Sequence, residues 1–138
     1  MKLCSACLLG IACRYDGLSK ANAKVLELAK TEVLIPVCPE QLGGRSTPRS
    51  SSEISKFGNV LEKSGKDVTK EFNKGALETL KIAKLHNINE AILKQRSPSC
   101  GSGQIYDGSF SGKIIKGDGI TTALLKKNGI KVISEEEL

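Results

Sequence analysis

The sequence has no tryptophan and only five aromatic residues, two tyrosines and three phenylalanines, among 138 residues. Proteins that stack single-stranded nucleic acid on a platform of aromatic rings need more of them, so this class is poorly supported. No apolar run is long enough to cross a bilayer. The first residues, Met1 to Cys7, contain no apolar signal-peptide core. We therefore expect a cytoplasmic protein without a membrane partner.

The sequence also has no even set of cysteines that would indicate a disulfide framework, since it contains five. A chain of this length can bury roughly two-thirds of its unfolded surface without disulfides. Free thiols are typical of a reducing cytoplasm. The formal net charge is +6, from 21 Lys and Arg against 15 Asp and Glu, which favours anionic partners such as nucleotides or RNA without specifying one. We expect one domain, residues 1–138.

Short apolar runs alternate with helical patterns along the chain. This alternation predicts an α/β fold, a three-layer α/β/α arrangement of Rossmann-like type with a mostly parallel sheet and long loops at the site. Gly75 lies inside a helical pattern, where it costs about 1 kcal/mol relative to alanine and indicates close backbone packing. The N-cap of that helix is expected at Asp67 or Thr69. The expected strands are 3–6, 33–37, 90–93 and 131–133, and the expected helices are 20–30, 68–85 and 120–127.

Two long stretches, 39–58 and 101–119, have no regular pattern, and loops of that length are usually functional or mobile. We expect the first to form a lid. Its Arg45 and Arg49 are expected to be solvated loop charges, and contact with an anionic substrate is the alternative. In the second stretch, Tyr106 occupies the place where a dinucleotide-binding fingerprint needs its third glycine. We therefore expect turns and a short hairpin around Tyr106 in place of a Rossmann cofactor site.

Three cysteines, Cys7, Cys38 and Cys100, each follow an apolar run and precede a glycine- or proline-rich turn. In open parallel sheets the ligand site lies beyond the carboxyl ends of the strands, so we expect these thiols to meet at one edge. Thiolates are the usual ligands of iron-sulfur clusters, and three of them would leave one iron open for chemistry. The alternative is three buried thiols that only pack, because cysteine is often buried.

The other two cysteines, Cys4 and Cys13, are also candidate ligands. Cys4 and Cys7 form a C-x2-C pair, a spacing typical of zinc or redox sites. Residues at odd separation in a strand point to opposite faces, so Cys4 should face away from Cys7. Cys13 is the more credible fourth thiol, because its loop lies near the expected site. Four thiolates would make a closed structural site. The second hypothesis is therefore a non-catalytic zinc or iron-sulfur module for structure or sensing, including one associated with RNA.

Five segments carry a resemblance to a known family: residues 5–10, 13–17, 36–44, 97–101 and 104–108. Over 2–138 the chain resembles the thiouracil desulfidase (TudS-like) family, also catalogued as domain of unknown function 523. The resemblance implies a [4Fe-4S] cluster held by Cys7, Cys38 and Cys100, whose fourth iron takes sulfur from a thiolated pyrimidine. Where a proline pair is expected after Arg49, the chain has Ser50, Ser51 and Ser52, a departure that bears on substrate preference.

Desulfuration of a thiopyrimidine replaces C=S by C=O and releases sulfide, so water must attack the carbon. Glu40, two residues past a candidate ligand, is the candidate general base, and a helix-capping role is its alternative. Ser97 and Ser99 are candidate hydroxyl donors to the pyrimidine or the leaving sulfur, unless they only brace the turn at Pro98. A free thiopyrimidine or its nucleoside is the expected substrate. A tRNA substrate is less favoured, because the chain carries no appended basic domain.

Two smaller features have structural interpretations. The Tyr-Asp-Gly sequence at 15–17 is repeated at 106–108, and we expect paired turns there in preference to paired catalytic groups. His86, the only histidine, is expected to end a helix near its negative pole and not to bind a metal.

Overall fold

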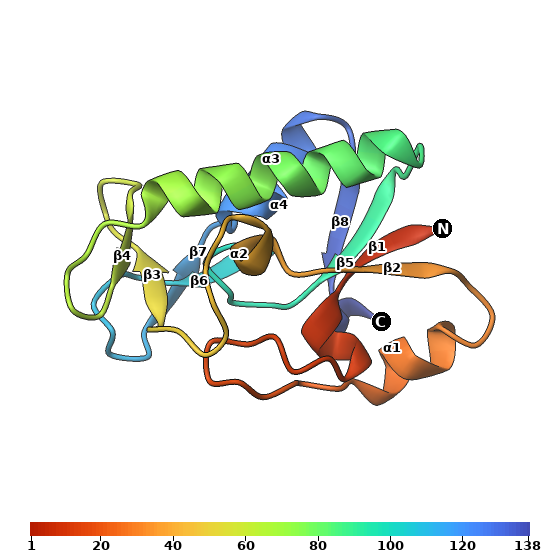
Figure 1. Ribbon diagram of the computed structural model, residues 1–138, viewed down its shortest axis with the longest axis horizontal. Coiled ribbons are helices and arrows are strands. Elements are labelled where there is room, and N and C mark those ends of the chain that lie inside the picture. Colours follow the sequence, from red (N-terminus) through yellow and green to blue (C-terminus); the bar gives the residue numbers. More distant parts are fainter.

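The computed structural model describes residues 1–138 and has a four-stranded parallel sheet at its centre (Figure 1). The strand order is β2-β1-β5-β8, and each neighbouring pair is parallel. The predicted α/β fold with a parallel sheet is confirmed, and the four predicted strands lie within one residue of the observed ones. These are β1 (Lys2–Ser5), β2 (Leu34–Val37), β5 (Glu90–Leu93) and β8 (Lys131–Ser134).

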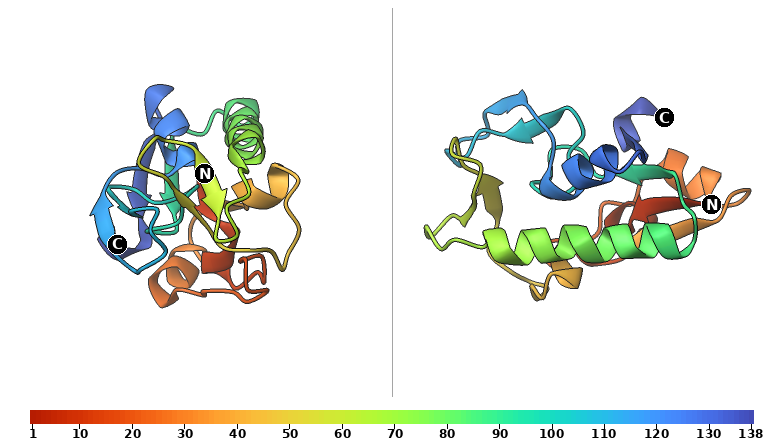
Figure 2. Two further views of the ribbon diagram at one scale, coloured as in Figure 1. Left: turned by 90° about the vertical axis from the view of Figure 1, so that its left-hand side faces the viewer. Right: turned by 90° about the horizontal axis from the view of Figure 1, so that it is seen from above.

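Helices cover both faces of the sheet, with α1 (Ala23–Leu28) below it and α3 (Thr69–Leu85) and α4 (Ile120–Lys127) above it in the left view of Figure 2. The Asn22 side chain caps α1 by accepting hydrogen bonds from two backbone N–H groups, so this helix is shorter than predicted. The N-cap of α3 is Val68, which corrects the expected Asp67 or Thr69. None of the helices is both long and apolar enough to cross a membrane.

The strands have apolar side chains on both faces, because each face packs against helices. Successive residues point to opposite sides of a strand. Leu3, Ala91 and Leu93 therefore join the cluster that contains Leu80 and Ala83 of α3 and Leu125 of α4. Cys4 and Ile92 face the other side, where they pack with Leu8 and Val25. Burial of each leucine, isoleucine or valine side chain contributes about 1.5–3 kcal/mol to the stability of the fold.

Two antiparallel hairpins lie together at the end of the molecule away from the N-terminus (Figure 1). The expectation that 39–58 is irregular is wrong in part, because the stretch contains the short helix α2 (Pro39–Leu42) and β3. A strand of three residues has too little periodicity to be recognised, and its partner β4 lies outside the stretch. The hairpin expected around Tyr106 is present. The four strands are β3 (Ser52–Ile54), β4 (Val60–Glu62), β6 (Gln104–Tyr106) and β7 (Ile114–Lys116).

The short helix α2 lies directly on the backbone of α3. A Cβ atom added to Gly75 would lie 1.9 Å from the carbonyl oxygen of Pro39, and one added to Gly43 would lie 2.0 Å from that of Glu71. Both distances are far below van der Waals contact, so only glycine fits at either position. The close backbone packing predicted at Gly75 is confirmed, and it holds in place the segment that follows Cys38.

We expect Gly75→Ala to destabilise the protein by about 1–3 kcal/mol, the usual cost of overpacking. In an open helix position the same change would stabilise by about 1 kcal/mol, so the sign of the effect is diagnostic. Urea denaturation followed by circular dichroism measures the change in the free energy of unfolding. The matched control is Lys74→Ala, at the neighbouring exposed position of α3, which should change this free energy by less than about 0.5 kcal/mol. A stabilised Gly75→Ala protein would contradict the close contact with α2.

Candidate functional site

A cavity of about 580 Å³ opens at the carboxyl ends of the strands and is lined by 26 residues. Four of the five cysteines line it, namely Cys7, Cys13, Cys38 and Cys100, and Cys4 does not. The structure thus brings together the three thiols that the sequence placed at strand ends. It also adds the neighbouring Cys13, as expected from the position of its loop. The charged residues of the lining are Arg14, Lys20, Glu40, Arg49, Glu53, Lys63, Lys94 and Arg96.

Cys7 and Cys38 leave the sheet side by side, because β1 and β2 are parallel and Ser5 pairs with Val37. Cys38 is the N-cap residue of α2. Cys7 lies in a 3₁₀ turn, η1 (Ala6–Leu9), directly after β1. The prediction that Cys4 faces away from Cys7 assumed that both lie in one strand. It does not apply, because Cys7 lies outside β1. Cys4 is excluded from the cavity because it lies within β1, fully buried in the cluster on the α1 side of the sheet.

Cys100 is positioned by a loop that lies on the N-terminus of α4. The first backbone N–H groups of this helix have no partner within it, and they donate instead to the loop: Ile120 N–H to Pro98 O at 2.9 Å and Thr121 N–H to Ser99 O at 2.9 Å. The Thr122 hydroxyl donates to the Cys100 carbonyl at 2.8 Å. Sequence reasoning missed this support. The loop that carries Cys100 is thus held on the N-terminus of α4.

The pKa values of Cys4, Cys38 and Cys100 are raised above the ordinary value of a thiol. Burial raises the pKa of Cys100 to about 11, although hydrogen bonds from Ser5 and Ser99 act in the opposite direction. Interaction with the Cys13 thiol, and then burial, raises the pKa of Cys38. Burial raises the pKa of Cys4 to about 12. Metal binding at such thiols must release protons, which makes it dependent on pH.

The arrangement of the thiols distinguishes two kinds of metal centre. No three His, Cys, Asp or Glu side chains surround one point in the way that a single metal ion requires. An iron-sulfur cluster is larger, and each thiolate binds a different iron atom, so its ligands lie further apart. Four buried or half-buried thiols around one cavity have the donor chemistry for a cluster.

Glu40 lies on the cavity between two arginine side chains. Its Oε1 atom accepts a hydrogen bond from Arg49 Nε at 3.1 Å and lies 3.6 Å from Arg45 Nη1. Its Oε2 atom has no hydrogen bond within the protein, which leaves this oxygen available. The helix-capping alternative for Glu40 is wrong, because α2 has no side-chain cap.

The expectation that Arg45 and Arg49 are solvated loop charges is wrong, since their side chains are only 6% and 4% exposed. Arg45 also pairs with Glu62 and donates to the Ser52 hydroxyl at 2.9 Å. Arg49 donates to the carbonyl of Cys13 at 3.0 Å. Buried carboxylates need a compensating charge, which draws both arginines inward. We expected a lid in this stretch. These contacts bind it to α2 and β4 instead.

Ser97 and Ser99 both line the cavity next to Cys100. The Ser97 hydroxyl accepts hydrogen bonds from the backbone N–H groups of Ser99 at 3.2 Å and Cys100 at 3.1 Å, so it does brace the turn. The Ser99 hydroxyl donates to Cys100 Sγ at 3.6 Å. Ser99 is therefore in direct contact with a candidate ligand, and Ser97 sets the shape of the loop.

The two Tyr-Asp-Gly segments form paired turns, as predicted. Asp16 accepts a hydrogen bond from the backbone of the residue two positions later at 3.0 Å, and Asp107 does the same at 2.9 Å. The tyrosines that precede them, Tyr15 and Tyr106, line the cavity, a role that sequence reasoning did not assign. His86 is the C-cap residue of α3, which confirms the prediction that it ends this helix.

Comparisons with known proteins agree with this arrangement of thiols. The chain is 48% identical over 147 residues to YbbK, an uncharacterised protein of Bacillus subtilis (strain 168), and the match covers 100% of this chain and 97% of YbbK. The solved structure of TudS, a [4Fe-4S]-dependent thiouracil desulfidase, is similar with a TM-score of 0.93 and 45% identity, over 99% of this chain and 91% of that chain. Residues 3–137 match the family model for 2-thiouracil desulfurase, and the chain belongs to this family.

Proposed function

We propose that this protein removes the sulfur of a thiolated pyrimidine, such as 2-thiouracil or 4-thiouracil, with water as the second substrate. The C=S bond becomes C=O and hydrogen sulfide is released, so no oxidant or reductant is needed. The observation that carries the proposal is the convergence of buried thiols on one cavity at the strand ends. Membership of the 2-thiouracil desulfurase family supports it.

The proposed cofactor is the [4Fe-4S] cluster on which the similar protein TudS depends. Cys7, Cys38 and Cys100 are the proposed ligands, because a neighbouring element fixes the backbone of each: η1 for Cys7, the start of α2 for Cys38 and the N-terminus of α4 for Cys100. A cluster with three thiolate ligands supplies an open iron, a Lewis acid that binds a thiocarbonyl sulfur and polarises the C=S bond. Cys13 lines the same cavity and its carbonyl accepts a hydrogen bond from Cys38 Sγ at 3.6 Å, so it is the competing candidate for a fourth ligand.

The remaining chemistry is assigned to Glu40 and the two serines. Glu40 Oε2 accepts a proton from the attacking water, while Arg45 and Arg49 hold the Oε1 side of the carboxylate. Ser99 donates its hydroxyl hydrogen to the pyrimidine or to the departing sulfur. Ser97 contributes by fixing the backbone of Ser99 and Cys100.

A cavity of about 580 Å³ is within the size range of small-molecule sites, roughly 300–1,000 Å³. We therefore propose a free thiopyrimidine or its nucleoside as the substrate, in preference to tRNA. All five cysteines are unpaired, which favours a reducing compartment and supports the cytoplasm as the proposed location. A non-catalytic zinc module is disfavoured, because the chain belongs to the 2-thiouracil desulfurase family.

Replacement of a ligand should remove the cluster. We expect Cys7→Ala, Cys38→Ala and Cys100→Ala proteins each to lose iron and the brown colour after anaerobic reconstitution, whereas Cys4→Ala keeps both. Iron content and the visible absorption spectrum are the measurements. Cys13→Ala decides the number of ligands: it should retain the cluster, and complete loss of iron in this variant would replace the open-iron assignment with a four-thiolate site.

Glu40→Gln should leave the iron content unchanged and lower kcat by roughly 10²-fold or more, the usual effect of removing a general base. The matched control is Glu62→Gln, which alters the same arginine network but does not line the cavity. We expect this control to lose stability while it retains most of its kcat. Full turnover of Glu40→Gln with normal iron would assign Glu40 a structural role and direct the search to Glu53, the other carboxylate that lines the cavity.

Salt dependence distinguishes a small substrate from tRNA. Binding of a nucleic acid falls with salt by a logarithmic slope of roughly −0.7 to −0.9 per phosphate contacted, whereas a free base has no phosphate. We expect sulfide release from thiouracil to change little over a salt series and to exceed that from thiolated tRNA. Efficient and strongly salt-sensitive desulfuration of tRNA, with the free base inert, would overturn the small-molecule assignment.

A further inference from the structure

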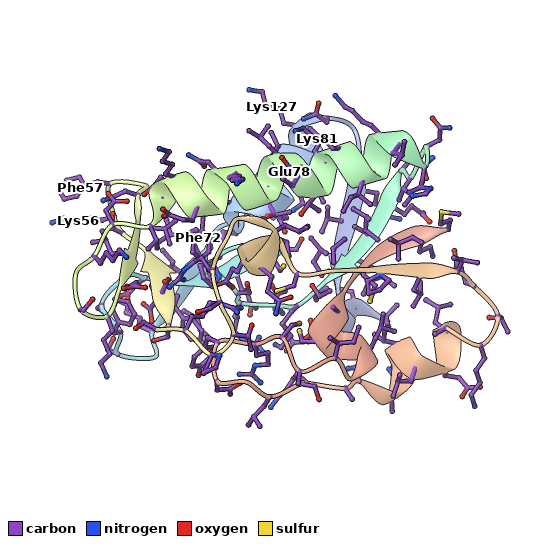
Figure 3. The ribbon with its side chains drawn as sticks, in the orientation of Figure 1. Lys56, Phe57, Phe72, Glu78, Lys81 and Lys127 are labelled. Carbon is purple, nitrogen blue, oxygen red and sulfur yellow. The ribbon has the colours of Figure 1, made fainter.

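The few aromatic residues of this chain are concentrated at the cavity. Of the five, Tyr15, Tyr106 and Phe110 line it. Phe72 is in the core, only 1% exposed, and Phe57 is 84% exposed at the tip of the β3-β4 hairpin, where Figure 3 shows it pointing outward. Aromatic rings lining a cavity provide apolar faces for a planar ligand.

Phe110 has an unusual backbone conformation in the turn between β6 and β7. Its φ angle is +57°, in the left-handed region that a bulky residue adopts only at a cost of about 1–3 kcal/mol. Such strain persists only where the surroundings fix the backbone in place. Burial in the core does not account for it, because Phe110 is half-buried and lines the cavity.

The contacts that fix this turn come from Glu53 on β3. Its Oε1 atom accepts hydrogen bonds from the backbone N–H groups of Gly108 at 3.0 Å and Phe110 at 3.1 Å. A Cβ atom on Gly108 would lie 2.7 Å from the carbonyl oxygen of Ile54, so the turn lies directly against the strand. One carboxylate thus holds the β6-β7 turn on the other hairpin and holds Phe110 at the cavity.

The other two aromatic residues are less suited to stack on a ligand. The guanidinium group of Arg14 lies over the Tyr15 ring, 5.6 Å from its centroid, and covers one face of it. Tyr106 is part of β6, where its pairing with Ile114 fixes its direction independently of the cavity. Phe110 has neither constraint, and its backbone is held in a strained conformation that keeps the residue at the cavity wall.

We propose that Phe110 is a specificity-determining residue whose ring stacks on the face of the pyrimidine, and that Glu53 is a positioning residue that acts through Phe110. This inference rests on the proposed function, because it assumes a pyrimidine in the cavity. Stacking of a base on an aromatic side chain contributes about 1–3 kcal/mol. It also selects planar aromatic rings, since a saturated ring offers no flat face with π electrons.

The test compares two ligands that differ in the aromaticity of the ring. Uracil is the product of the proposed reaction, and 5,6-dihydrouracil has the same carbonyl and N–H groups on a saturated ring. Calorimetry on the anaerobic, cluster-loaded protein gives both dissociation constants. We expect Phe110→Leu, which keeps an apolar side chain, to weaken uracil binding about 5- to 150-fold and dihydrouracil binding much less.

Phe110→Trp should retain the preference for uracil, and Phe57→Ala, at the exposed hairpin tip, should leave both dissociation constants unchanged. Glu53→Ala should weaken uracil binding in the wild-type background. It should have little further effect in a Phe110→Leu background, because coupled residues are not additive. A full additional loss in the double variant would overturn the positioning role of Glu53.

Equal effects of Phe110→Leu on the two ligands, or no effect on either, would overturn stacking, and so would a wild-type protein that does not bind uracil. Failure of the proposed function looks different. In that case the wild-type protein binds uracil, and Phe110→Leu weakens this binding selectively, but no sulfide is released from thiouracil.

Discussion

The site depends on the parallel register of β1 with its two neighbours. Leu3 pairs with Ile35 on one side and with Ala91 on the other, so β1, β2 and β5 end at the same edge of the sheet. The hydroxyl of Ser5, at the end of β1, accepts a hydrogen bond from the backbone of Lys94, the residue after β5, at 2.8 Å. A shift of one residue in either pairing would exchange the side chains that pack against α3 and α4 with those that pack on the side of α1, so packing on both faces fixes the register. The same burial therefore fixes the positions at which the cysteine-bearing segments leave the sheet.

Charge compensation around Glu40 is the second constraint, and it explains why the stretch after α2 is ordered. Arg45 and Arg49 carry two positive charges into a region with two carboxylates, Glu40 and Glu62, and all four side chains are at most 14% exposed. A buried ion pair often contributes little net stability, because desolvation opposes the attraction. A conformation that separated these side chains would leave an uncompensated buried charge, however. This penalty disfavours other conformations of the segment. The network thus fixes the geometry around the cavity more than it stabilises the fold.

Prediction from sequence succeeded where a pattern is local and failed where a partner is distant. Residues 90–93 and 120–127 were predicted at their observed limits, since strand and helix periodicity is visible in the residues themselves. The burial of Arg45 could not be predicted, because nothing near it in the sequence identifies Glu62 as its partner. The same holds for the Cys100 loop, whose support comes from the first N–H groups of α4. Convergence of the cysteines was predictable, because parallel strands place their carboxyl ends together whatever the details of the loops.

The small number of aromatic residues limits only the number of bases that the protein could stack. A low count of aromatic residues argues against a surface that stacks several bases in a row. Three of the five aromatic residues line a single cavity instead. One planar ring requires one stacking partner held in the right place. The cost of holding it is visible in the positive φ angle of Phe110 and in the carboxylate of Glu53, which accepts two backbone hydrogen bonds from the turn. Composition therefore limits how many bases the protein can stack, and in the proposed binding mode Phe110 provides the one stacking partner.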